Sequence, residues 1–161
     1  MQSFVVLREA YLPVPNSTRY IKMVYEPYLP AQTPAYQNKN WNQSLAACKA
    51  DGGWLAIDND DTIHQYLYNI LMANGIFPNY KALWIGGYST TDKWHWELLD
   101  GTKITLTGLG QAKFAPGHPD GTGGGLHFFA TLGSYCCGFW SDWDYTVAWS
   151  PGGYFCEIML P

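Results

Sequence analysis

The stretch from Ala82 to Tyr88 reads Ala-Leu-Trp-Ile-Gly-Gly-Tyr and sets the interpretation of the C-terminal half of the chain. Its short apolar run, closed by two glycines, predicts a β-strand. The same kind of segment recurs as KWHWELL at 93–99, HFFATLG at 127–133 and GYFCEIML at 153–160. Between them lie loops dense in Gly, Pro and Asp, including FAPGHPDGTGGG at 114–125, and such long loops in a compact domain usually have a function.

Before this strand the sequence predicts two helices. In WNQSLAACKADGG, at 41–53, Trp41, Leu45 and Cys48 recur at helical spacing, so Cys48 is expected to face the core. A second helix is predicted from about 59 to 75, with acidic residues in its first turn and Asn-Gly at its end. Helices first and strands later indicate an α+β fold.

Residues 1–35 contain short apolar segments interrupted by prolines. FVVLREAYLP at 4–13 and RYIKMVYEPYLP at 19–30 predict short β segments, and nearby prolines confine these segments to sheet edges or strand ends. We expect one globular unit in which residues 1–35 form an N-terminal β extension packed on a domain over 36–161.

Composition excludes several classes of protein. Of the 161 residues, 17% are aromatic and 14% are charged, which argues against disorder and against a coiled coil. The net charge is −4 and the few basic residues form no run, so no nucleic-acid partner is expected. No apolar run reaches the length of a membrane span, and the N-terminal one is too short for a signal peptide.

Cysteine usage bears on the compartment. The four cysteines are Cys48, Cys136, Cys137 and Cys156. Four cysteines permit three pairings, and spacing alone does not choose among them. There is no CxxC pair, and sequons at 16–18 and 42–44 are consistent with secretion. Because the N-terminal run is too short for a signal peptide, we expect either an intracellular protein or a trimmed mature form with an added Met1. The residues that follow favour the second, an extracellular protein, secreted or at the cell surface.

Several short motifs then occur in a characteristic order. A helix with an inward cysteine is followed by GGWLAIDND, a second helix and Trp-Ile-Gly. The later markers are Trp94-His95-Trp96, Asp100-Gly101, His118-Pro119-Asp120, Trp140-Ser141-Asp142 and Tyr154-Phe155-Cys156-Glu157. Together they resemble the C-type lectin-like domain family over roughly 36–161. The resemblance implies two helices flanking small antiparallel sheets, with the ligand site in a long loop region.

The resemblance also implies a disulfide between Cys48 and Cys156, which joins the first helix to the final strand. Both cysteines lie in apolar segments near opposite ends of the domain, in agreement with this pairing. A bridge that closes a loop of roughly 100 residues stabilises a protein by about 4–5 kcal/mol in the chain-entropy picture.

The second disulfide of the family has no counterpart, because the matching positions near Leu126 and Thr146 are not cysteines. Cys136 and Cys137 stand instead between two expected strands, in a turn. We favour a bond between these neighbours, which would stiffen that turn; an intermolecular bridge and free thiols are the alternatives. Nothing in the pattern implies redox catalysis.

Sugar-binding members of the family hold one calcium ion through a Glu-Pro-Asn or Gln-Pro-Asp triplet, a further Glu and a Trp-Asn-Asp triplet. Calcium takes six to eight oxygen ligands, so such a site leaves positions for two sugar hydroxyls. The proline of the first triplet is usually cis, which turns its neighbours toward one ion.

Only some of the family's calcium ligands have a counterpart in this chain. Asp120 and Asp142 match family ligands, whereas His118 replaces Glu or Gln, and an imidazole is a poor ligand for a hard cation. Ser141 replaces Asn, and nothing acidic lies where the further Glu belongs, near 124–125. The predicted calcium ligands are therefore Asp120, Asp142 and, as a compensating acid, Asp144; the alternative is that Asp120 and Asp142 only cap loop backbone. A softer metal on His118 and His127 is a further, weaker option.

Aromatic side chains offer a second route to sugars. Trp140, Trp143 and Tyr145 are expected near the rim, where flat apolar faces suit sugar C–H groups. Trp140 is mostly a core residue in the family, so Trp143 is the better candidate. The full predicted carbohydrate-binding set is His118, Asp120, Trp140, Ser141, Asp142 and Trp143.

These features predict non-catalytic recognition of a glycan or glycoprotein, calcium-assisted and with an aromatic rim, as in adhesion. The alternative is a calcium-independent lectin-like domain that binds a protein or another surface. An enzyme is a minor third option, because no nucleophile, base and acid stand at a familiar spacing. Sugar specificity and oligomeric state are not predicted.

Overall fold

The strands and helices below come from a computed structural model that describes residues 11–26, 39–73, 82–89, 94–97, 103–105, 113–121, 123–132, 135–144, 146 and 152–159. The bounds of the elements in chain order are β1 (Leu12–Pro13), β2 (Tyr20–Glu26), α2 (Trp41–Ala50), β3 (Trp54–Leu55), α3 (Asp61–Ala73), β4 (Ala82–Ser89), β5 (Trp94–Glu97), β6 (Lys103–Thr105), β7 (Gly125–Leu132), β8 (Tyr135–Trp143) and β9 (Gly152–Ile158).

Both predicted helices form, and side-chain caps fix where they begin. The Asn40 side chain accepts a hydrogen bond from the Gln43 amide, and the Gln43 side chain accepts one from the Asn40 amide, which closes the first turn of α2. The Asp60 carboxylate caps α3 by accepting from the Ile63 amide at 2.8 Å. In α2, Cys48 is fully buried, as its spacing predicted.

The strands join into one mixed sheet with β9 and β4 at its centre. β9 pairs antiparallel with β2 and β3 and parallel with β4. From β4 the sheet continues in two directions, through β5 to β6 and through β7 to β8, and every pairing between the described strands except β4–β9 is antiparallel. The fold is therefore α+β. It differs from the small antiparallel sheets that the family resemblance implied in one respect, because β4 and β9 are parallel.

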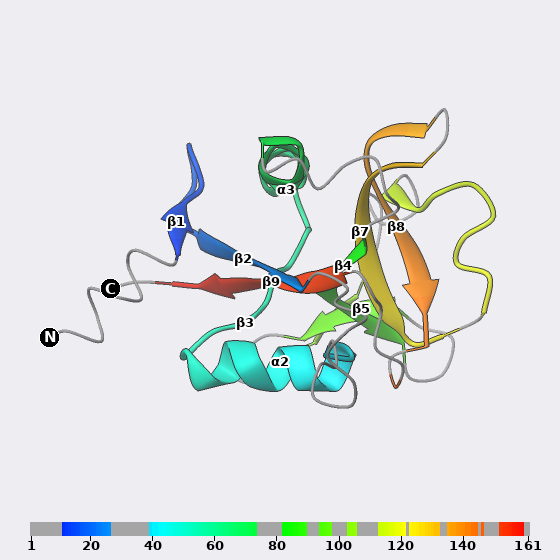
Figure 1. Cartoon of the computed structure of the whole chain (residues 1–161), viewed down its shortest axis with the longest axis horizontal. Helices are drawn as coiled ribbons and strands as arrows, with labels where there is room; N and C mark the ends of the chain where they lie inside the picture. The colour runs from blue at the N-terminus through cyan, green and yellow to red at the C-terminus, as the bar shows by residue number, and fades with distance from the viewer. Residues whose placement is uncertain are drawn as a thin grey trace, which may run out of the picture.

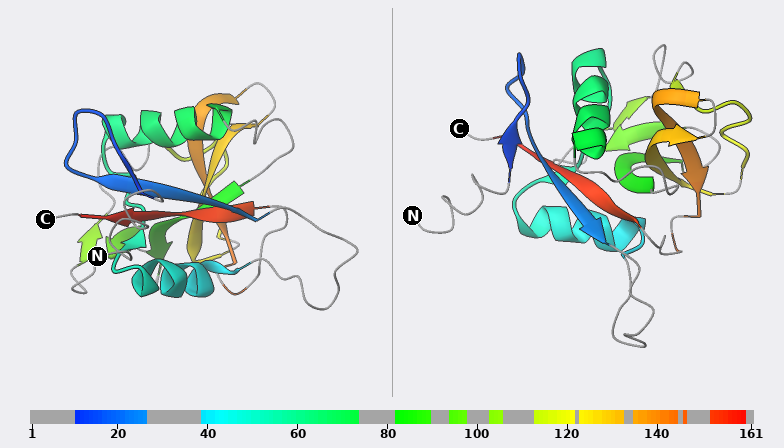
Figure 2. Two further views of the ribbon diagram at one scale, coloured as in Figure 1. Left: turned by 60° about the vertical axis from the view of Figure 1, so that its left-hand side comes forward. Right: turned by 45° about the horizontal axis from the view of Figure 1, so that its top comes forward.

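The helices lie on opposite sides of the β2–β9 strands, and the β7–β8 hairpin stands at the end of the molecule away from β1 (Figures 1 and 2). α3 buries Ile63, Leu67 and Leu71 against the larger core cluster. α2 buries Trp41 and Cys48 in a second cluster. Neither of these two described helices has the length and hydrophobicity to cross a membrane.

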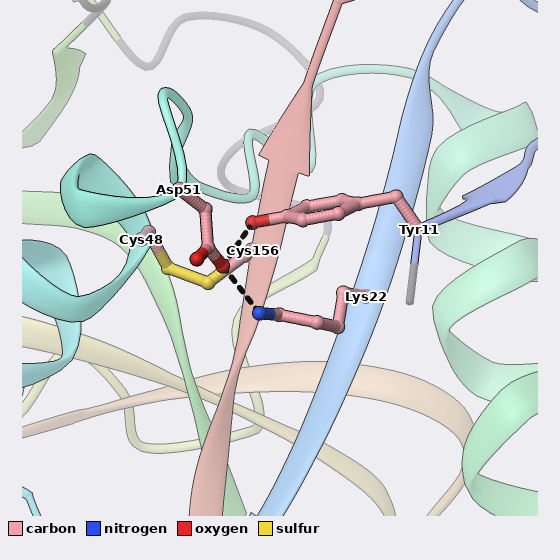
Figure 3. Close-up of a disulfide and its surroundings, with 5 residues drawn as sticks. All are labelled: Tyr11, Lys22, Cys48, Asp51 and Cys156. Atoms are coloured by element: carbon pink, nitrogen blue, oxygen red, sulfur yellow. Dashed lines mark hydrogen bonds and ion pairs between the residues drawn. A yellow bond between two sulfur atoms is a disulfide. The ribbon is translucent and has the colours of Figure 1, made fainter. Parts of the chain in front are cut away.

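A disulfide between Cys48 and Cys156 joins α2 to β9, as the family resemblance implied. Beside it, Asp51 at the end of α2 accepts a hydrogen bond from the Tyr11 hydroxyl at 2.9 Å and forms an ion pair with Lys22 (Figure 3). Burial and the hydrogen bond to Asp51 raise the pKa of the Tyr11 phenol. The chain before α2 is thus fastened to the same helix end as the disulfide.

The N-terminal β segments add to the edge of this sheet. β2 pairs with β9 over its whole length, and β1 pairs with β2 at two positions. The predicted division between an extension and a domain, at 35–36, lies outside the described residues, as do residues 1–10.

The turn predicted for Cys136 and Cys137 is wrong, because both belong to β8. Cys136 pairs with Thr131 of β7, across a shift of register between Phe129 and Thr131. Cys137 and Gly138 have φ of 82° and 91°, so the chain bulges inside a strand here. Cys137 is disulfide-bonded, in agreement with the predicted vicinal bond. The side chain of Cys136 lies outside the described set, so the pairing itself stays a prediction.

Candidate functional site

The segment from Lys113 to Gly121 lies against the outer edge of β8 and carries the predicted loop motif. Phe114 forms a parallel bridge with Trp140, and the Ala115 amide donates to the Trp140 carbonyl at 2.8 Å. The His118 amide then donates to the Ala115 carbonyl at 2.9 Å and turns the chain. The backbone therefore delivers the end of this segment to the last residues of β8.

Asp142, near the end of β8, is the centre of the site. Its side chain is fully buried. One oxygen, Oδ1, accepts from the Asp120 amide at 2.9 Å and lies 2.8 Å from His118 Nδ1; the other, Oδ2, accepts from the Gly121 amide at 3.0 Å. This carboxylate therefore holds His118, Asp120 and Gly121 of the loop, so Asp142 does cap loop backbone, as the alternative interpretation proposed.

His118 and Asp120 lie on the open side of this carboxylate. Their side chains are 25% and 40% exposed, and His118 Nδ1 lies 3.8 Å from Asp120 Oδ2. Donor atoms of His118, Asp120 and Asp142 all lie within 4.8 Å of one another. The intervening His118–Pro119 peptide bond is cis, as the family resemblance implied. The loop motif and the strand motif, separated in sequence, thus form one group of ligand-capable atoms.

A second buried carboxylate, Asp58, supports β8 from the core side. The Trp140 indole donates to Asp58 Oδ2 at 2.7 Å, and His64 Nδ1 lies 2.5 Å from the same oxygen. The other ring nitrogen, His64 Nε2, lies 2.8 Å from the Gly138 carbonyl, which can only accept, so this nitrogen carries a proton. His64 of α3 is thereby connected to β8 twice, directly at the Gly138 carbonyl and through Asp58 at Trp140. Sequence reasoning missed Asp58 and His64.

The lectin C-type domain family matches residues 37–124, more than half of the chain. The chain belongs to the C-type lectin family. By sequence, none of the curated proteins matches it.

Solved structures of low sequence identity share the fold of this C-type lectin domain. The SPL-1–GlcNAc complex has a TM-score of 0.67 at 15% identity, with 96% of each chain covered. SPL-2 of Saxidomus purpuratus, a Ca2+-independent C-type lectin, has a TM-score of 0.65 at 18% identity, covering 94% of this chain and 92% of its own. A calcium-independent type II antifreeze protein has a TM-score of 0.61 at 17% identity, with 94% and 93% covered.

The remaining predicted site residues of this lectin domain are not on the open surface with His118. Trp140 is 1% exposed and Ser141 is 6% exposed. Trp143 is partly buried against the second core cluster and follows Asp142 on β8, so the two side chains point to opposite faces of the sheet. Tyr145 lies outside the described residues. The expected aromatic rim therefore reduces, in the described chain, to the partly exposed Trp143.

Asp144 is held by its own loop. Its Oδ1 accepts from the Thr146 amide at 2.9 Å and from the Thr146 hydroxyl at 2.7 Å. Hydrogen bonds from the Thr146 side chain and backbone lower the pKa of the Asp144 carboxyl. Asp144 is not in the His118–Asp120–Asp142 group.

The donors gathered at the site do not fit calcium. Calcium needs six to eight oxygens, whereas the described group supplies two carboxylates and one imidazole nitrogen. The calcium prediction for Asp120, Asp142 and Asp144 stays a prediction.

His127 lies behind the site, on β7 opposite Ser141, and not with His118. Its ring centroid is 3.7 Å from that of Trp84, and burial lowers the pKa of His127 to about 3. The imidazole is therefore neutral at physiological pH and packs as part of the core. The structure does not bring it to His118 as a second metal ligand.

Proposed function

We propose that the chain recognises carbohydrate without catalysis, through the surface formed by His118, Asp120 and the end of β8. The partner is a glycan or glycoprotein. Membership of the C-type lectin family supports this proposal, and the SPL-1–GlcNAc complex shows that a protein of the same fold holds a sugar.

The observation that carries the proposal is the arrangement around Asp142. Its hydrogen bonds to the Asp120 and Gly121 amides place two partly exposed polar side chains, those of His118 and Asp120, side by side on a rigid base. A carboxylate that accepts and an imidazole that donates or accepts suit the paired hydroxyl groups of a sugar. Since the base is fixed, little conformational entropy is lost when a ligand binds.

An extracellular location, secreted or at the cell surface, belongs to the same proposal. It is supported by the Cys48–Cys156 disulfide, because disulfides persist in oxidising compartments. Two further parts of the proposal are calcium assistance and a contact between Trp143 and the sugar, and each can be tested separately.

The test measures glycan binding by the purified, oxidised protein on a broad glycan array, followed by calorimetry with GlcNAc, galactose and mannose. We expect Asp120→Ala to weaken binding about tenfold or more, since it removes a charge-assisted hydrogen bond. Asp61→Ala is the matched control, because Asp61 is a carboxylate with a 78% exposed side chain on α3. Absence of any glycan binding, or equal binding by both variants, contradicts the proposal.

The same titrations are repeated with added calcium and with a chelator. An affinity that is insensitive to the chelator but reduced in Trp143→Ala assigns recognition to polar and aromatic contacts. An affinity lost with the chelator, restored by calcium and absent in Asp142→Ala supports the predicted calcium site instead.

A further inference from the structure

We propose that His118, Asp120 and Asp142 form a binding site for a borderline divalent cation of the zinc class, which they prefer to calcium. The inference concerns the donor atoms themselves and does not rest on glycan recognition. It follows from the same substitution that weakens the calcium prediction, because His118 puts an imidazole nitrogen where the family carries a side-chain oxygen.

The spacing of the donor atoms suits a small cation. Zinc binds imidazole nitrogen and carboxylate oxygen at about 2.0–2.2 Å, so two ligands of a tetrahedral ion lie about 3.3 Å apart. His118 Nδ1 lies 2.8 Å from Asp142 Oδ1 and 3.8 Å from Asp120 Oδ2, which brackets that separation. One donor atom of each residue lies within 4.8 Å of those of the other two, so side-chain rotations can close the set on one ion, which takes the place of the proton on the bound ring nitrogen.

The chemistry of the set also favours zinc. One imidazole and two carboxylates are ordinary zinc ligands, and three protein ligands are the number found in zinc sites that keep an open position. Calcium and magnesium prefer sets made of oxygen alone. The described group cannot supply six oxygens, so the hard cations gain less here than zinc does.

The surroundings hold the ligands in place. Asp142 is fully buried and its two oxygens accept the Asp120 and Gly121 amides, which orients the carboxylate before any ion arrives. His118 and Asp120 are partly exposed, so the group faces solvent on one side. That side leaves the fourth coordination position for water or for a ligand oxygen.

The first experiment is calorimetry of the oxidised full chain with Zn2+, and separately with Ca2+ and Mg2+. We expect saturable binding of one zinc ion and weaker binding of calcium. His118→Asn and Asp120→Asn should each weaken zinc binding by about 10–100-fold or more. The Asn amide can still donate to Asp142 in place of the ring nitrogen, so His118→Asn should keep the loop folded.

Asp144→Asn is the matched control, because this carboxylate lies on the same stretch but is held by Thr146 outside the group. It should bind zinc as the wild type does. Titration with Co2+ gives a direct reading of geometry, since four-coordinate cobalt absorbs strongly in the visible range and six-coordinate cobalt does not. The cobalt band should be lost in both ligand variants and kept in Asp144→Asn.

Failure to bind zinc saturably, equal affinity for zinc and calcium, or unchanged binding in both ligand variants overturns the inference. Zinc binding is measured without sugar, so a protein that binds zinc but no glycan contradicts only the proposed function. A protein that binds glycan but no zinc contradicts only this inference.

Discussion

Asp58 and Asp142 are two fully buried carboxylates at β8, the first contacting the strand from another part of the chain and the second belonging to it, and they hold different kinds of partner. Asp58 connects side chains of the scaffold, His64 on α3 and Trp140 on β8. Asp142 connects β8 to the backbone and imidazole of a surface loop. The same functional group therefore supports the fold at Trp140 and shapes the candidate site two residues later, at Asp142.

Because their partners differ, removing the Asp58 carboxylate should have a different effect from removing the Asp142 carboxylate. If Asp58 is lost, its partners stay inside the core, where water cannot replace the missing acceptor. If Asp142 is lost, the amides of the loop can turn outward and be hydrated. Loss of a scaffold carboxylate should therefore lower global stability, whereas loss of the site carboxylate should open the loop locally.

Asp58→Ala is expected to have the largest effect, a loss of about 3–5 kcal/mol in the free energy of unfolding, because it leaves a buried histidine without its partner. Denaturant unfolding under oxidising conditions measures it. Asp58→Asn is the matched variant, since the amide oxygen can still accept from Trp140 while the charge facing His64 is lost. A loss no larger for Ala than for Asn would contradict the assigned role of the Trp140 hydrogen bond.

Asp142→Ala should cost less, about 1–3 kcal/mol, because it strands two amides that solvent can reach after a local movement. Hydrogen exchange is the measurement: the Asp120 and Gly121 amides should lose protection, while those of β7 and β8 keep theirs. If the whole β7–β8 hairpin loses protection, Asp142 is part of the scaffold and the distinction from Asp58 fails.

A pH profile tests another buried polar side chain, the imidazole of His127. Burial lowers the pKa of His127 from 6.5 to about 3, so the unfolded chain binds the proton more readily between these values. Stability from this group is therefore complete above about pH 6.5 and is lost as pH falls toward 3, with a slope approaching about 1.4 kcal/mol per pH unit.

In His127→Asn this contribution to the slope of unfolding free energy against pH should disappear. Denaturant unfolding from pH 7 to pH 4 gives both slopes. A profile with the same slope in wild type and variant would show that His127 titrates as an ordinary exposed histidine.

Local patterns explain which elements the sequence predicted. The α2 stripe, the capped start of α3 and the apolar run of β4 each depend on neighbouring residues, and each formed as expected. β8 was missed because residues 139–142 read Phe-Trp-Ser-Asp, which is neither an apolar run nor an alternation of apolar and polar positions, although all four are buried.

The site was predicted only in part for a related reason. His118, Asp120 and Asp142 were found because the family motif combines a proline loop with a Trp-x-Asp segment. No motif links Asp58 to Trp140, 82 residues later, and only the folded chain brings them together. The same contact explains why Trp140 is unavailable to a ligand, since its indole is turned inward to Asp58.

Asp120→Asn should have the smallest effect on stability, within about 0.5 kcal/mol, because surface substitutions away from buried networks rarely cost more. The link from Asp120 to Asp142 runs through the backbone amide, which the substitution keeps, and the side chain is 40% exposed. Thermal unfolding measures stability, and glycan calorimetry measures recognition on the same sample. A variant of unchanged stability with weakened binding assigns this carboxylate to the ligand, whereas a large loss of stability would place Asp120 with Asp58 in the scaffold.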